Sequence, residues 1–196
     1  MSPSPRQMKL GMFMREAGHH IAAWRTQEAP KSPGNNLAHN IEVAQLAESG
    51  LFDMLFWADS AGIWGGDKEA LSRLCRVAWI EPLVLLSAFA AVTKHIGLVC
   101  TATTTYEQPF SLARRFASLD VMSGGRAGWN LVTSANAAEA HNFGSDQHAA
   151  KSDRYRRAAE FAEVVQGLWN SWDDDAFVED KEAGLFFDPD KLHVLN

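Results

Sequence analysis

Three apolar runs of the sequence each end in side chains that form hydrogen bonds. Asp59 follows the run LFWA, Thr101 ends the run IGLVCT, and Asn130 and Ser134 belong to the segment WNLVTS. If these runs are parallel strands of a barrel, their carboxyl ends meet at one mouth and the four side chains gather there. The set combines one carboxylate with neutral amide and hydroxyl groups, which favours an uncharged heteroaromatic ligand with several donors and acceptors.

Each of these residues also has a purely structural interpretation. Asp59 could cap the turn after its strand, Thr103 to Thr105 could be ordinary β-branched strand residues, and Trp129 could belong to the core. Asn130 is harder to explain in this way, because a buried amide without a partner costs about 1–3 kcal/mol. Polar residues at three strand ends therefore favour a site, with Trp129 left open between the core and a wall of that site.

Histidine and cysteine residues give weaker indications. His19 and His20 are adjacent after the first apolar run, but no third ligand stands at a spacing suitable for a metal site. His20 is a candidate catalytic residue lining the active site, because imidazole titrates near neutral pH. The other histidines are expected at the surface or as caps: His39, His95, His141, His148 and His193. Cys75 and Cys100 lie far apart and are expected to be reduced.

The elements that would position these side chains alternate between short apolar runs and longer helical patterns. Strands are expected at 8–13, within 51–59 with the apolar centre at 54–57, at 96–101 and at 127–133. Their nearly continuous apolar character predicts burial on both faces, with Leu131 and Val132 anchoring the fourth strand. Helices are expected at 37–49, from 82 through 92, at 109–122 and at 153–172. Their predicted caps are Asn35 or Asn36 with Gly50, Glu81-Pro82, Gly124-Gly125 and Ser152.

This alternation predicts an α/β fold built from right-handed βαβ units, either an open doubly wound sheet or a TIM (β/α)8 barrel. The glycine fingerprint of dinucleotide-binding doubly wound sheets is absent after Gly11. Polar strand ends suit a barrel, whose sites lie at the carboxyl ends of its strands. A whole barrel takes roughly 250 residues, and about four βα units are visible, so residues 1–196 are interpreted as the N-terminal portion of a single barrel domain.

Composition excludes several other classes of function. Hydrophobic residues make up 46% and charged residues 21% of the chain, as in an ordinary globular protein. The net charge of −6 comes with no basic face for nucleic acid. No run approaches the ~18 apolar residues of a membrane span, and the start MSPSPRQMKLGMF lacks the apolar centre of a signal peptide. We expect a cytoplasmic protein that binds neither nucleic acid nor membrane.

The sequence also contains five strings that are specific when taken together: LFWAD, IGLVCTATTTYEQPFSLARRFASLD, SGGRAGWNLVTS, AHNFG and SDRYRRAAEF. In this order they resemble the bacterial-luciferase-like flavin-dependent monooxygenases, and within them the group of nitrilotriacetate, dibenzothiophene-sulfone and long-chain alkane monooxygenases. The resemblance runs from about Met8 to the C-terminus. It implies the N-terminal half of a luciferase-like TIM barrel.

The resemblance also implies which residues contact the cofactor, reduced FMN. Amide and hydroxyl groups can bind the isoalloxazine edge and the ribityl chain, and a tyrosine near a helix start can reach the phosphate. The residues carried over are Asp59, Thr101, Asn130, Ser134 and Tyr155. The family usually has a histidine four residues before that tyrosine, where this chain has Lys151, a cationic donor of different geometry.

The function implied is that of a two-component monooxygenase, which takes reduced FMN from a separate flavin reductase and uses O2 to oxygenate a small organic substrate. The alternative is a truncated, non-catalytic flavin-binding or assembly half-barrel that needs a C-terminal partner. A half barrel exposes strand edges and an apolar face, so a homo-oligomer or a complementing C-terminal half is expected. A nicotinamide-dependent dehydrogenase is disfavoured because its phosphate-binding glycines are missing.

Overall fold

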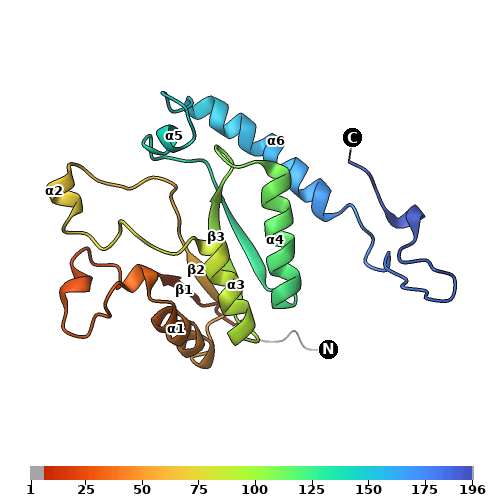
Figure 1. Ribbon diagram of the computed structural model, residues 1–196, viewed down its shortest axis with the longest axis horizontal. Coiled ribbons are helices and arrows are strands. Elements are labelled where there is room, and N and C mark those ends of the chain that lie inside the picture. Colours follow the sequence, from red (N-terminus) through yellow and green to blue (C-terminus); the bar gives the residue numbers. More distant parts are fainter. Residues whose placement is uncertain (1–6, 196) are drawn as a thin grey trace.

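The computed structural model describes residues 7–195, so residues 1–6 and 196 of the predicted domain 1–196 lie outside the described part. A sheet of four parallel strands forms the centre of the molecule (Figure 1). The strands are β1 (Gly11–Met14), β2 (Met54–Trp57), β3 (Gly97–Thr103) and β4 (Ala127–Val132). All four predicted strands are present, and β3 continues two residues beyond its predicted end at Thr101.

Four long helices follow the strands: α1 (Leu37–Ser49), α3 (Pro82–Val92), α4 (Pro109–Ser123) and α6 (Lys151–Trp169). Short helices are α2 (Lys68–Leu71), α5 (Glu139–Asn142) and the 3-10 turns η1 (Ala23–Arg25), η2 (Pro33–Asn35) and η3 (Pro189–Lys191). The predicted caps of the first three long helices are confirmed. Asn36 accepts the His39 N–H at 3.1 Å, Glu81 accepts the Val84 N–H at 2.8 Å, and Gly124 ends α4 at a left-handed φ of 68°.

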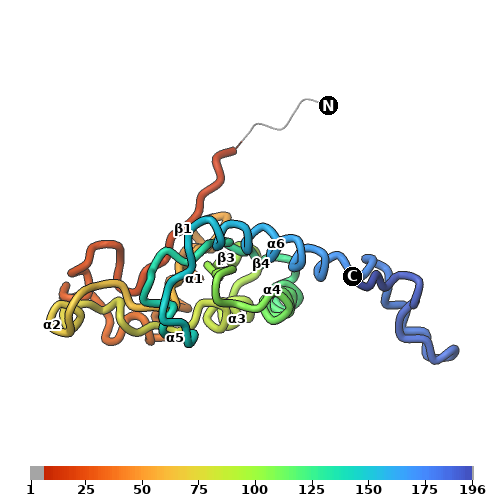
Figure 2. Tube along the Cα trace, turned by 90° about the horizontal axis from the view of Figure 1, so that it is seen from above, coloured from red at the N-terminus to blue at the C-terminus, as the bar shows by residue number. Residues whose placement is uncertain are grey.

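The predicted bounds of the fourth helix are wrong. Helix α6 begins at Lys151 after Ala150, so Ser152 lies inside its first turn and does not cap it. The helix ends at Trp169, before the predicted end at Trp172. Trp172 forms an antiparallel bridge with Leu192 instead, so a contact with a later part of the chain overrides the helical pattern. Residues after α6 extend away from the sheet (Figure 2).

The order of the strands decides between the two architectures that the sequence left open. The strands lie in chain order, β1-β2-β3-β4, and all pairs are parallel. A doubly wound sheet reverses its order at a switch point, whereas a barrel adds each strand beside the previous one. Helix α4 contacts both α3 and α6, and α1 contacts α3. The fold is therefore about half of an α/β barrel with its outer helices.

The helix-facing side of the sheet carries the core. Met14, Trp57, Cys100 and Trp129 form one row across the four strands, because they pair in register. The first three are at most 4% exposed. The Trp129 ring lies among Phe116, Phe161 and Trp169, with ring centroids 6.0–6.2 Å apart, and its Nε1 donates to the Ala102 carbonyl at 2.9 Å. Trp129 is thus a core residue and not a wall of the site.

The opposite side of the sheet is open, so the expected burial on both faces is wrong. Phe13 and Met54 on this side are 43% and 40% exposed. In a closed barrel such a face is covered by side chains from all eight strands, and four strands cannot enclose it. Leu131, predicted as a buried anchor, is 39% exposed because it lies on β4, an edge strand.

Candidate functional site

A cavity of about 320 Å³ lies at the carboxyl ends of β2, β3 and β4. Four of the side chains that the sequence singled out line it together: Asp59, Thr101, Asn130 and Ser134. The volume is at the lower end of the roughly 300–1,000 Å³ that small-molecule sites occupy. A groove of about 590 Å³ is larger, but it is lined mainly by α3 and α4 and shares only Glu81 and Leu83 with the cavity at the strand ends.

Asn130 and Thr101 occupy paired positions on β4 and β3, on the side of the sheet opposite the helices. The Asn130 Nδ2 atom donates to Thr101 Oγ1 at 2.8 Å. This bond fixes the plane of the amide, and the Asn130 Oδ1 atom is not bonded to another residue within 7–195. The pair therefore offers a positioned acceptor to a ligand in the cavity.

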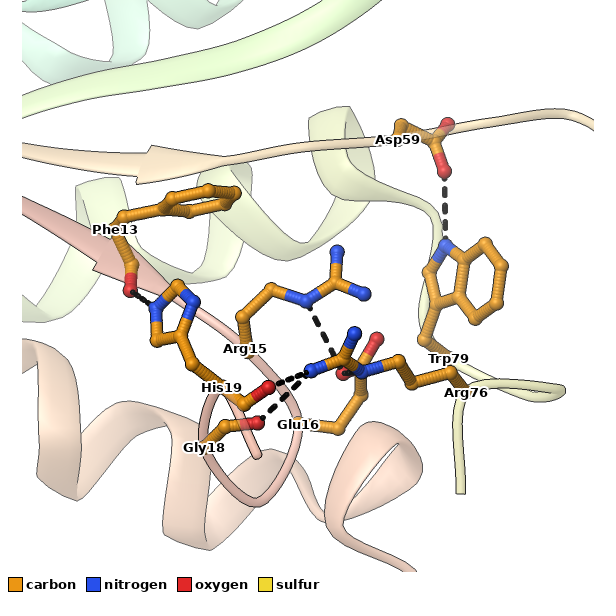
Figure 3. Close-up of polar contacts among 8 residues, drawn as sticks. All are labelled: Phe13, Arg15, Glu16, Gly18, His19, Asp59, Arg76 and Trp79. Atoms are coloured by element: carbon orange, nitrogen blue, oxygen red, sulfur yellow. Dashed lines mark hydrogen bonds and ion pairs between the residues drawn. The ribbon is translucent and has the colours of Figure 1, made fainter. Parts of the chain in front are cut away.

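Asp59 lies directly after β2, and its side chain has a hydrogen-bond partner outside the turn that it could have capped. Trp79 donates its Nε1–H to Asp59 Oδ1 at 2.9 Å (Figure 3). Burial raises the pKa of the Asp59 carboxyl above its usual range, and hydrogen bonds from Trp79 and the Ser60 backbone only partly offset this effect. At a given pH, the Asp59 carboxyl is therefore protonated to a larger extent than an exposed aspartate.

Ser134 is buried at the end of β4 within a chain of hydroxyl and carboxylate groups. Its Oγ lies 2.8 Å from Thr103 Oγ1 and donates to Glu139 Oε2. The other oxygen of Glu139 accepts from Ser60 Oγ at 2.8 Å. Glu139 is only 3% exposed and lines the cavity, so it ties the ends of β2 and β4 together. This role of Glu139 could not be predicted from periodicity, because Glu139 lies in a four-residue helix.

The expectation that His148 is a surface or capping residue is wrong. Its Nδ1 lies 2.6 Å from Tyr106 Oη, and its Nε2 lies 3.0 Å from the Ser134 carbonyl oxygen. The Tyr106 ring stacks on Phe143, which lines the cavity, with centroids 4.8 Å apart. His148 therefore supports the cavity wall from behind, through contacts between residues more than ten positions apart that no local pattern reveals.

The structure places the remaining predicted site residues outside this cavity. His20 is exposed, and its Nδ1 accepts the Ala22 N–H at 3.1 Å. Tyr155 is 58% exposed in the first turns of α6, with Lys151 Nζ 5.8 Å from its ring centroid. The Tyr155 and Lys151 side chains are close to each other and exposed, so they are accessible to a ligand that extends beyond the cavity.

A second cavity, of about 340 Å³, adjoins the first and was missed by the sequence reasoning. Arg15 and Glu16, which follow β1 directly, line it together with Arg76 and Trp79. The mouth of the sheet thus receives polar side chains after all four strands. Within residues 7–195 no group of three metal-binding side chains occurs, and none of the helices described is long and apolar enough to cross a membrane.

A parallel sheet in chain order, helices along one side and polar cavities at the carboxyl ends define the class of (β/α)-barrel proteins. Within this class, the chain belongs to the luciferase-like monooxygenase family, whose model matches residues 14–191. The fold, the family and the related group predicted from the sequence are therefore confirmed.

Individual relatives agree with this assignment. The chain is 50% identical over its whole length to N-acetyl-S-(2-succino)cysteine monooxygenase of Bacillus subtilis (strain 168), covering 43% of that protein. It is 46% identical to nitrilotriacetate monooxygenase component A of Aminobacter aminovorans, over 97% of this chain and 44% of that protein. The chain thus spans less than half the length of these relatives.

Two crystal structures show the same arrangement. Long-chain alkane monooxygenase superimposes with a TM-score of 0.88 at 37% identity, over 96% of this chain and 45% of that one. A riboflavin lyase, solved with modified FMN and riboflavin, gives a TM-score of 0.86 at 34% identity, over 96% of this chain and 43% of that one. The chain therefore matches less than half the length of each of these two solved chains.

Proposed function

We propose that residues 1–196 form the N-terminal, flavin-binding portion of a single barrel domain in an FMN-dependent monooxygenase. The observation that carries this proposal is the convergence of Asp59, Thr101, Asn130 and Ser134 on one cavity at the strand ends. The enzyme would receive reduced FMN from a separate flavin reductase and use O2 to oxygenate a small organic substrate. The flavin supplies the redox chemistry when bound, and the chain binds and orients it.

The side chains of the cavity fit the polar edge of a flavin. Asn130 offers the Oδ1 acceptor described above, and the Thr101 hydroxyl that accepts from its amide lies beside it. Asp59, with its raised pKa, can act as either donor or acceptor toward a ring nitrogen or carbonyl. The relatives support this assignment, because they include monooxygenases and a riboflavin lyase whose crystal structure contains modified FMN.

Tyr155 and Lys151 are proposed to hold the phosphate of the cofactor. Both lie in the first turns of α6, a helix of 19 residues whose amino end favours an anion. Their side chains are adjacent, at 5.8 Å from Lys151 Nζ to the Tyr155 ring centroid. Lys151 would supply charge where related proteins are expected to carry histidine. His20 is retained as a prediction for the substrate side, in the loop after β1.

A second candidate function is a non-catalytic half-barrel that binds flavin or assembles with a C-terminal partner. The open sheet face with its exposed Phe13 and Met54 favours this alternative for the chain alone. A complementing half or a second copy would cover that face.

The two free cysteines, Cys75 and Cys100, agree with the reducing cytoplasm proposed as the location.

Titration of the chain with oxidised FMN, and with reduced FMN under argon, tests the proposal. We expect Asn130→Ala to weaken binding by about tenfold, because the lost hydrogen bond contributes roughly 1–1.5 kcal/mol. Asp59→Ala combined with Asn130→Ala should weaken it further. Asn170→Ala, an exposed amide after α6, is the matched control and should leave the affinity unchanged.

Unaltered FMN affinity in the double variant would contradict the assignment of the cavity. Formation of the oxygenated product from a candidate substrate, with a flavin reductase, NADH and O2, separates the two functions. Turnover supports the monooxygenase, and FMN binding without turnover supports the non-catalytic half-barrel.

A further inference from the structure

The second cavity at the strand ends adjoins the proposed flavin cavity directly. The two share four lining residues: Ala58, Asp59, Ser60 and Trp64. A molecule in the second cavity would therefore touch the same segment after β2 that lines the first. This position is where a substrate must lie if it is to react with a bound flavin.

Arg15 brings a guanidinium group into this second cavity from the end of β1. Its side chain is only 20% exposed, and its Nε lies 3.6 Å from Glu16 Oε2. Its terminal nitrogens form no hydrogen bond with other residues within 7–195, and Figure 3 shows them on the side that faces Asp59 and Trp79. A guanidinium held in this way presents two parallel N–H groups, the geometry that binds a carboxylate in two-pronged fashion.

Arg76 supplies a second guanidinium, which is anchored to the loop after β1. Its Nη2 donates to the His19 carbonyl at 2.5 Å and to the Gly18 carbonyl at 3.4 Å. Its Nε lies 3.8 Å from Glu16 Oε2. Arg76 therefore closes the cavity on one side and holds the loop that follows β1 (Figure 3).

Glu16 lies between the two arginines and is 3% exposed. Its Oε2 atom is buried and has no hydrogen-bond partner in the described part of the chain, although both arginines approach it. Glu16 alone faces the two guanidinium groups, while the second carboxyl that lines the cavity, Asp59, is bonded to Trp79 and has its pKa raised by burial, so positive charge is in local excess around Arg15. Such an excess is costly unless an anion compensates it, and apolar walls from Trp64 and Leu74 strengthen the attraction.

We propose that this cavity binds a carboxylate group of the substrate, with Arg15 as the main donor and Arg76 as a second positive charge. The proposal rests on the proposed function, since it takes the adjoining cavity to hold the flavin. The substrate is then a small organic acid, and the atom that becomes oxidised extends past Asp59 toward the flavin cavity. Glu16 is then a positioning residue that orients both guanidinium groups.

Binding of succinate to the chain, measured by isothermal titration calorimetry in a low-salt buffer free of carboxylates, tests this inference. Dimethyl succinate is the uncharged counterpart of the probe. We expect succinate to bind the wild type and the ester to bind at least about tenfold more weakly, because charge-assisted hydrogen bonds are lost. Arg15→Gln should weaken succinate binding by roughly tenfold or more. Arg15→Lys should restore part of it, since the charge remains without the fork.

Arg114→Gln is the matched control, because Arg114 lies in the outer groove between α3 and α4. The circular dichroism spectrum of each variant shows that the chain is folded, and its FMN affinity tests the flavin proposal separately. In a chain that binds FMN normally, either of two results would overturn the carboxylate site. The first is a succinate affinity that Arg15→Gln leaves unchanged, and the second is equal affinity for succinate and its ester. Succinate binding that depends on Arg15 in a chain that binds no FMN would support the site and reject the flavin proposal.

Discussion

At the scale of single residues, Asp59 is the group whose chemistry is most altered by the fold. It lines both cavities and accepts a hydrogen bond from Trp79 at 2.9 Å. Burial is the largest cause of its raised pKa, so the folded chain holds the carboxyl proton more firmly than the unfolded chain does. Its ionised form is therefore a cost to stability at neutral pH.

This cost predicts a specific pH dependence for Asp59→Asn. The asparagine keeps an oxygen acceptor for Trp79 and cannot ionise. As pH rises from about 4, the usual carboxyl pKa, through the higher pKa of folded Asp59, the wild type should lose free energy of unfolding relative to the variant. Urea unfolding followed by tryptophan fluorescence at several pH values measures the difference.

The control for this measurement is Asp146→Asn, at an exposed position outside both cavities. A difference between wild type and Asp59→Asn that stays constant with pH, or that changes in favour of the wild type as pH rises, would show that the carboxyl is not held in its protonated form by burial.

At the scale of elements, Glu48 connects helix α1 to the turn before β3. Its Oε1 accepts from the backbone N–H groups of Lys94, His95 and Ile96 at 2.8, 2.7 and 3.1 Å. Burial by itself raises the pKa of Glu48, but these three backbone hydrogen bonds together lower it. One side chain thus satisfies three amides that lie just before the central strand begins.

Glu48→Ala should lower the free energy of unfolding by about 1–3 kcal/mol, because it leaves these amides without their charged acceptor. The lowered pKa means that this contribution is present above the usual carboxyl pKa and is lost as pH falls through the folded pKa. Chemical denaturation of the variant and of Glu42→Ala, an exposed change on the same helix, provides the comparison. An equal, small effect of both changes would contradict the role of Glu48.

Local patterns predicted most of the strands and helices, because the residues that determine these elements lie within them or next to them. Apolar runs locate the strands to within three residues, and caps such as Asn36 and Gly124 lie next to the helices they end. The end of α6 could not be predicted, since Trp172 pairs with Leu192. Trp129 could not be assigned either, because the side of the sheet on which it lies depends on its register with Cys100.

The candidate site was predicted in part for the same reason. Asp59, Thr101, Asn130 and Ser134 stand at strand ends, so the topology alone brings them together. Arg15 and Glu16 also follow a strand, but the cavity that they line is completed by Arg76, which lies far along the chain and contacts Glu16. Such long-range contacts leave no periodic pattern in the sequence.

At the scale of the whole molecule, the chain is part of a barrel, and its strand ends already line a cavity. It spans 43–45% of the length of the two relatives and two crystal structures reported above. The helix-facing side of the sheet is packed, while the other side exposes Phe13 and Met54. A flavin seated over Asn130 and Thr101 would lie on that open side, so the remaining wall of its site has to come from further protein.

A crystal structure of the chain grown with FMN tests the central claim most directly. We predict that the isoalloxazine ring lies in the cavity at the ends of β2, β3 and β4, with polar contacts to Asp59 and Asn130. The same crystals would show whether the phosphate reaches Tyr155 and Lys151. FMN bound in the outer groove between α3 and α4, or an empty cavity in crystals grown well above the measured dissociation constant, would contradict the assignment of the flavin site.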